Sequence, residues 1–118
     1  MNDTHDPALQ ADARRNELIS LFLVRTVEDV EQMRRNVPSL ISGNDAAWRH
    51  LRFCAQRIRG TAHGLGLGVL SACARELEQL AEERFARTGI DEQFLLSVTS
   101  AIEMVAIEVN GIRRFEAS

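Results

Sequence analysis

The chain has 118 residues, is 45% hydrophobic and 26% charged, and carries a formal net charge of −3. This length suits one domain with one core, and the balance of residues is that of a soluble globular protein rather than a disordered one. The acidic total gives no reason to expect nucleic-acid binding, and no uninterrupted apolar run approaches the roughly 18 residues of a membrane span. We therefore expect a cytoplasmic protein without direct membrane contact.

Four segments show the alternating spacing of three and four between apolar residues that is typical of amphipathic helices. Residues 1–15 are polar and are expected to form an N-terminal arm, with room for a short helix after Pro7. The helices are predicted over 16–37, 46–63, 67–86 and 92–115, with a loop from Ser39 to Asp45. Asn44 or Asp45 and, farther on, Asp91 are plausible caps. The predicted fold is all-α, an antiparallel up-down four-helix bundle over residues 16–118.

The helix predicted over 46–63 has a polar stripe beside its apolar one. Five of its residues follow one another at spacings of 3, 4, 3 and 4 and so share one strongly cationic face: Arg49, Arg52, Gln56, Arg59 and His63. Gly60 lies on this face, one turn beyond Gln56, although a glycine inside a helix costs up to about 1 kcal/mol relative to alanine. Either the glycine lets a partner's backbone or a phosphoryl group come close, or the stripe is simply a solvated face.

The stretch Ala55-Gln-Arg-Ile-Arg-Gly-Thr-Ala62, followed by Leu65-Gly66, resembles the signature of histidine-containing phosphotransfer (HPt) domains. That signature is Ala-His-x-Leu-Lys-Gly-Ser-Ala, then three variable positions and a Gly. The family's next helix, which usually ends in Leu-Glu, is matched by Leu70, Cys73, Ala74, Leu77 and Glu78. The resemblance implies a four-helix bundle of bacterial two-component signalling. Its histidine takes a phosphoryl group from the aspartate of one receiver domain and passes it to another.

Residue by residue, the resemblance places Gln56 where the family has the phosphorylated His. Arg59 then takes the place of the Lys that assists the phosphoryl group, and Gly60 that of the Gly that opens the surface. A glutamine has no imidazole nitrogen that could attack phosphorus, so the chain as written is expected not to accept phosphate. Gln56 is either an introduced replacement for His or the natural residue of a pseudo-HPt, and both remain open.

The partner that the resemblance implies is the receiver domain of a response regulator or hybrid kinase. The face expected to bind it comprises Arg49, Arg52, Gln56, Arg59, Gly60 and His63. The alternative is a non-catalytic helical adaptor or dimerisation module, whose Arg-rich surface binds an acidic partner without any role in phosphotransfer. The oligomeric state is left open.

His63 is the other residue considered as a phosphate acceptor. It lies seven positions beyond Gln56 and so points in nearly the same direction, roughly 10 Å farther along the helix. The residues after it do not continue the signature, and we expect it to stabilise the C-terminal end of the helix instead. Cys54 and Cys73 are expected to be core or near-core thiols, and no metal or cofactor is expected. Four acidic residues are expected to form a solvated helix face: Glu76, Glu78, Glu82 and Glu83.

Overall fold

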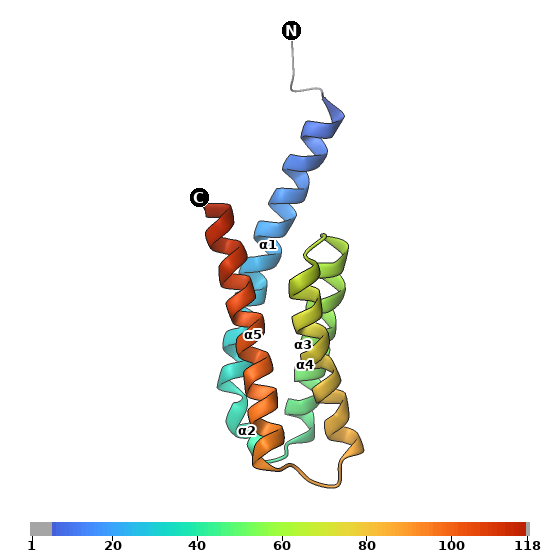
Figure 1. Ribbon diagram of the computed structural model, residues 1–118, viewed down its shortest axis with the longest axis vertical. Helices are drawn as coiled ribbons and strands as arrows, with labels where there is room; N and C mark the ends of the chain where they lie inside the picture. The colour runs from blue at the N-terminus through green and yellow to red at the C-terminus, as the bar shows by residue number, and fades with distance from the viewer. Residues whose placement is uncertain (1–5, 118) are drawn as a thin grey trace.

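The computed structural model describes residues 6–117 and contains five helices within them. These are α1 (Pro7–Arg35), α2 (Val37–Ile41), α3 (Asp45–Gly64), α4 (Gly68–Ala86) and α5 (Glu92–Ala117). The four long helices run up and down the bundle, with α3 and α4 forming one hairpin beside α1 and α5 (Figure 1). The predicted all-α helical bundle is confirmed.

Trp48 is the largest side chain of the core and is fully buried. Its indole N–H donates a hydrogen bond of 3.1 Å to the carbonyl of Leu40, and its ring stacks on Phe94 with 5.8 Å between centroids. Trp48 therefore joins α3 to both α2 and α5. The apolar stripe predicted on this helix continues through Leu51, Ala55, Ile58 and Ala62, which are buried, to Leu65, which is only partly buried.

The N-terminal arm is where the structure differs most from the prediction. From Pro7 onward the segment is helical and continuous with the rest of α1, while residues 1–5 of the predicted arm lie outside the described residues. The Asp6 side chain caps this helix by accepting a hydrogen bond of 2.9 Å from the backbone N–H of Ala8, and Pro7 suits the first turn. This part of α1 extends past the other helices and is exposed, which explains why its sequence lacks an apolar stripe (Figure 1).

The loop predicted after the first helix contains a short helix, α2. Pro38 lies in its first turn, where the missing N–H of proline costs nothing, so the proline starts a helix here as well as following one. Gly43 then adopts a positive φ of 78°, and the Asn44 side chain caps α3 by accepting from the backbone N–H of Ala47 at 3.1 Å. The predicted cap at Asp91 is also present, since its carboxylate accepts from the backbone N–H of Phe94 at 2.7 Å.

Helix α5 is the most apolar of the four long helices. An 18-residue window within its segment Glu92–Glu116 has a mean hydropathy of 1.4, and the segment is long and apolar enough, by length and composition alone, to cross a membrane. The same test is passed by core helices of soluble proteins, and 33% of the relevant window is buried inside this bundle. Its buried residues include Val98, Ile102, Val105 and Val109.

Candidate functional site

The polar stripe predicted on α3 lies on the outer face of this helix, on the side next to α4. The side chains of Arg49, Arg52, Gln56 and His63 are exposed, as is Gly60, while Arg59 is half-buried. A Cβ added at Gly60 would meet nothing within 4 Å, so the packing of the bundle does not require a glycine there. The glycine instead leaves bare surface one turn beyond the exposed amide of Gln56.

Arg59 is held by an ion pair with Glu78 of α4. Its Nε donates to one carboxylate oxygen of Glu78 at 2.5 Å, and one of its terminal nitrogens lies 3.5 Å from the other oxygen. The side chain of Glu78 is only 10% exposed and that of Arg59 is 33% exposed. The pair neutralises part of the cationic stripe and fixes the guanidinium, whose remaining donors are available to an anion at the surface.

The prediction that Glu78 belongs to a solvated face is therefore wrong. Glu76, Glu82 and Glu83 are exposed as expected, but Glu78 is buried to 8% relative exposure and paired. Glu78 lies four residues after Ala74 and three before Ala81, both of which are fully buried, so helical spacing places it at the edge of the α4 core stripe. The sequence signal for this was that spacing, which Glu76 does not share.

Two further contacts bring the polar sides of α3 and α4 close together. The hydroxyl of Ser71 on α4 donates a hydrogen bond of 3.0 Å to the backbone carbonyl of Arg59 on α3, and this bond links the two helices. The guanidinium carbon of Arg52 lies 5.5 Å from the ring centroid of Phe85, a cation–π distance. The stripe thus belongs to a surface that both helices build.

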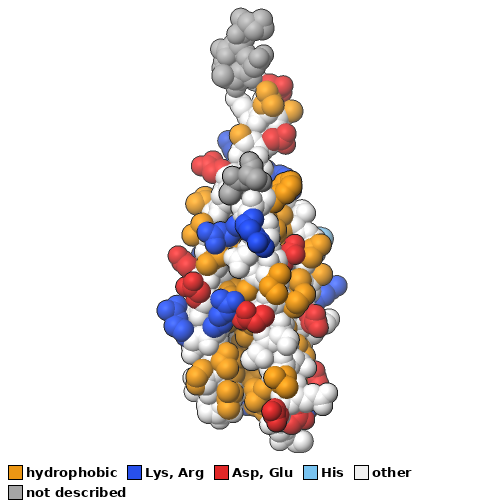
Figure 2. Space-filling view, turned by 60° about the vertical axis from the view of Figure 1, so that its left-hand side comes forward, with side chains coloured by type: hydrophobic (Ala, Val, Ile, Leu, Met, Phe, Trp, Pro, Cys, Tyr) orange, Lys and Arg blue, Asp and Glu red, His pale blue; other side chains and the backbone are white. Residues whose placement is uncertain are grey.

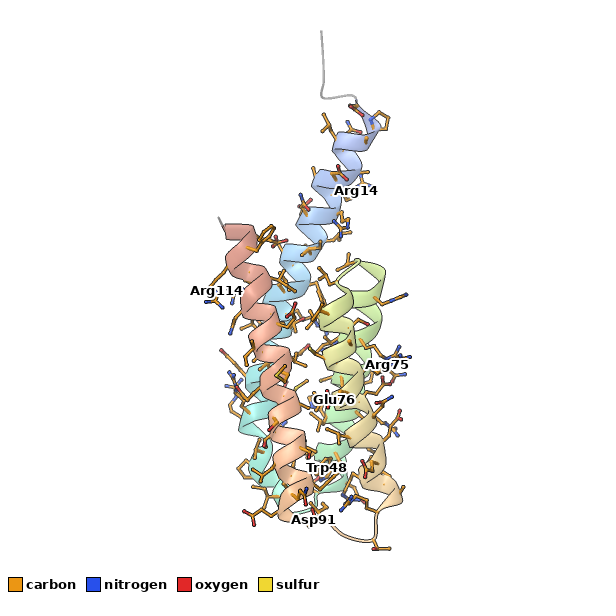
Figure 3. The ribbon with its side chains drawn as sticks, in the orientation of Figure 1. Arg14, Trp48, Arg75, Glu76, Asp91 and Arg114 are labelled. Atoms are coloured by element: carbon orange, nitrogen blue, oxygen red, sulfur yellow. The ribbon has the colours of Figure 1, made fainter. Side chains whose placement is uncertain are left out.

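A groove of about 680 Å³ runs along this surface between α3 and α4. Its polar lining comes from Arg59 and His63 of α3 and from four residues of α4: Ser71, Arg75, Glu76 and Gln79. Arg75 projects outward from the α3–α4 pair, on the side away from α5 (Figure 3). The groove combines two guanidinium groups and one carboxylate, that of Glu76, with hydroxyl, amide and imidazole groups, so its cationic and hydrogen-bonding groups outnumber its single acidic one and suit an anionic or acidic partner. The α4 contribution was missed from sequence, since only α3 was searched for a stripe.

The remaining histidine and thiol groups of the described chain offer no second reactive centre. His50 is half-buried with its ring nitrogens 3.7 and 3.9 Å from the sulfur of Cys54. Burial raises the pKa of the Cys54 thiol and, likewise, that of Cys73, so both favour the unreactive neutral form. Both cysteines are buried or half-buried, as predicted. Among residues 6–117, no group of three or more His, Cys, Asp or Glu side chains could hold a metal ion.

Comparison with known protein families identifies the chain. The family model of the Hpt domain matches residues 17–107, which is most of the sequence and includes the whole α3–α4 hairpin. The chain belongs to the Hpt domain family, whose members are histidine phosphotransfer modules of phosphorelays. No curated protein and no solved structure matches it.

Proposed function

We propose that this chain docks the receiver domain of a response regulator or hybrid kinase through the polar face of α3 and the adjoining groove. As written, it does not accept a phosphoryl group at position 56. Hpt domains generally interact with receiver domains, which supports the choice of partner. We propose further that the chain acts in the bacterial cytoplasm, as its resemblance to two-component signalling modules implies.

The observation that carries this proposal is the exposed Gln56 amide on a cationic surface. A receiver domain offers an acidic pocket at its phosphorylation site, and a surface rich in arginine complements it. The bare surface at Gly60 allows the edge of such a pocket to approach the α3 backbone. The amide of Gln56 can donate and accept hydrogen bonds there, but it provides no nucleophile for phosphorus.

Arg59 has a positioning role in this proposal. Its guanidinium is fixed by Glu78 and can present its remaining donors to phosphoryl or carboxylate oxygens. Because this long side chain is already ordered before the partner arrives, less conformational entropy is lost on binding. We therefore expect Glu78→Gln to weaken receiver binding although Glu78 itself is buried.

The test offers a phosphorylated receiver domain to the chain and to its Gln56→His variant. The expected result is label on the variant alone, stable in base and lost in acid, as for a phosphohistidine. Label on the chain as written would instead point to His63 and contradict the proposal. A His63→Ala variant of the unaltered chain decides that case.

Binding is measured separately by calorimetry, with receivers from several systems. Gly60→Glu should abolish binding, because it places a bulky negative charge in the open surface. Leu9→Glu is the matched control, since Leu9 is 57% exposed on the part of α1 that extends beyond the bundle. If no receiver binds, and the Gln56→His variant takes no label, the adaptor interpretation replaces this one.

A further inference from the structure

The outer side of α5 carries a second apolar stripe that the bundle does not cover. Val98, Ile102 and Val105 point into the core and are 0–1% exposed. On the other side of the same helix, Leu96, Met104 and Ile107 are 59%, 51% and 60% exposed. Figure 2 looks onto the side where α5 lies, and orange hydrophobic side chains gather there between charged groups. This second stripe explains why α5 is apolar enough to resemble a membrane span.

The outer stripe also contains two small residues. Its full order is Leu96, Ser100, Met104, Ile107, Gly111 and Phe115, at spacings of 4, 4, 3, 4 and 4, and Phe115 is 82% exposed. A Cβ added at Gly111 would meet nothing within 4 Å, and this glycine does not have a positive φ. Neither the fold of one chain nor its backbone geometry therefore explains a glycine here, where alanine would make a more stable helix. Close approach of another helix would explain it.

The stripe reads alike in both directions along the helix. Reversal about the point midway between Met104 and Ile107 exchanges these two residues, exchanges Ser100 with Gly111, and exchanges Leu96 with Phe115. Bulky positions thus fall opposite bulky ones, and small positions opposite small ones. A two-fold interface needs this self-complementarity, because residue i of one copy contacts residue j of the other while j contacts i.

The charges at the ends of α5 favour the same arrangement. Asp91 and Glu92 lie at its N-terminal end, while Arg113, Arg114 and Glu116 lie near its C-terminal end, which keeps a net positive charge; Figure 3 labels Asp91 and Arg114 at the two ends. In an antiparallel pair, the acidic end of one copy lies beside the basic end of the other, and the two helix dipoles oppose each other favourably. A parallel pair would bring like charges together.

We propose that two copies of this chain associate through the outer stripes of α5, packed antiparallel about a two-fold axis. The contact runs from Leu96 to Phe115, about 30 Å of helix. One helix from each copy makes a small interface, so we expect a reversible dimer with a dissociation constant on the order of 10 μM. The interface uses none of the residues of the polar face on α3. The proposed dimer and the proposed receiver docking can therefore be tested independently of each other.

Sedimentation equilibrium on the full chain, from about 1 to 500 μM, brackets this constant and tests the proposal. The chain should pass from monomer to dimer across the range, and Ile107→Glu should stay monomeric throughout. Leu9→Glu is the matched control, since Leu9 is 57% exposed but lies far from the stripe, and it should dimerise like the unaltered chain. Gly111→Ala should weaken the dimer at least tenfold while leaving the circular dichroism spectrum unchanged.

Charge reversal tests the orientation. Glu92→Arg and Arg114→Glu should each weaken the dimer, and the double variant should recover the affinity of the unaltered chain. Failure to recover would exclude the antiparallel arrangement. A chain that remains monomeric at every concentration, or an Ile107→Glu variant that dimerises normally, would overturn the proposal. A monomer that cosediments with phosphatidylcholine vesicles would also overturn it, assigning the stripe to a membrane surface instead.

Discussion

Replacing Arg59 with Met keeps a long side chain over the groove but removes the guanidinium from Glu78. The Glu78 carboxylate that remains is only 10% exposed, so it is poorly hydrated. Removing one partner from a fully buried ion pair costs about 3–5 kcal/mol, whereas an exposed pair contributes at most about 1 kcal/mol. Because the Arg59 side chain is 33% exposed, water reaches the pair from that side. We therefore expect Arg59→Met to cost about 2 to 3 kcal/mol of folding stability.

The double variant Arg59→Met with Glu78→Leu separates the loss of the pair from the burial of an unpaired charge. Replacing both partners by apolar side chains of similar size should bring stability back to within about 1 kcal/mol of the unaltered chain. The coupling between the two positions is then about 2 kcal/mol. Urea unfolding supplies the free energies, with circular dichroism and the fluorescence of Trp48, the single tryptophan, as independent probes.

Arg34 and Glu103 provide a control cycle in the same molecule. Their ion pair at 2.6 Å joins α1 to α5, and their side chains are 47% and 49% exposed. We expect a coupling below about 0.5 kcal/mol for this exposed pair. If the coupling between Arg59 and Glu78 is no larger than this control, burial does not decide the energetics of the site, and the reasoning fails.

Two further predictions concern the turn between α3 and α4 and the loss of folding stability at acidic pH. Gly66→Ala should cost about 1–2 kcal/mol in urea unfolding, because Gly66 has a φ of +77°, which strains any residue with a Cβ; the Arg15 guanidinium, 3.0 Å from the added Cβ, can move aside. Gly64→Ala, with nothing within 4 Å, should be neutral or stabilising, and equal losses would contradict this account. The hydrogen bond from Arg34 lowers the pKa of the Glu103 carboxyl below its usual value of 4.5, so its stabilisation is present above that pH and is lost as pH falls through the folded-state pKa. The stability difference between the chain and Glu103→Gln should therefore shrink as the pH falls below 4.5, and a difference independent of pH would refute this explanation.

The sequence alone predicted the helices of the second half of the chain closely. The segments predicted over 46–63, 67–86 and 92–115 correspond to Asp45–Gly64, Gly68–Ala86 and Glu92–Ala117. Their limits are local properties, because capping side chains, glycine turns and the spacing of apolar residues act within a few positions. The polar face of α3 was likewise predictable, since helical geometry alone puts its residues on one side.

In the first half of the chain, local sequence patterns did not predict the helices correctly. Residues 7–15 were predicted as an arm with room for a short helix after Pro7, because they lack an apolar stripe. The structure has a helix from Pro7, capped by Asp6, but this helix is continuous with the rest of α1, which the prediction missed. Helix α2 was missed because five residues are too few to show a period. The first error comes from using burial as the signal for helix formation where little is buried, and the second from the shortness of the segment.

Only the tertiary structure decided the environment of the charged residues. Helical spacing places Glu78 beside the α4 core stripe, but only the close packing of α4 on α3 buries it against Arg59, whereas Glu76 and Glu82 stay exposed. The same packing creates the groove and adds Arg75 to the surface. A sequence fixes which side chains share a helix face, because that depends on bonds and dihedral angles within one segment. The ion pairs across helices depend on how two faces meet in space, and that requires the whole core.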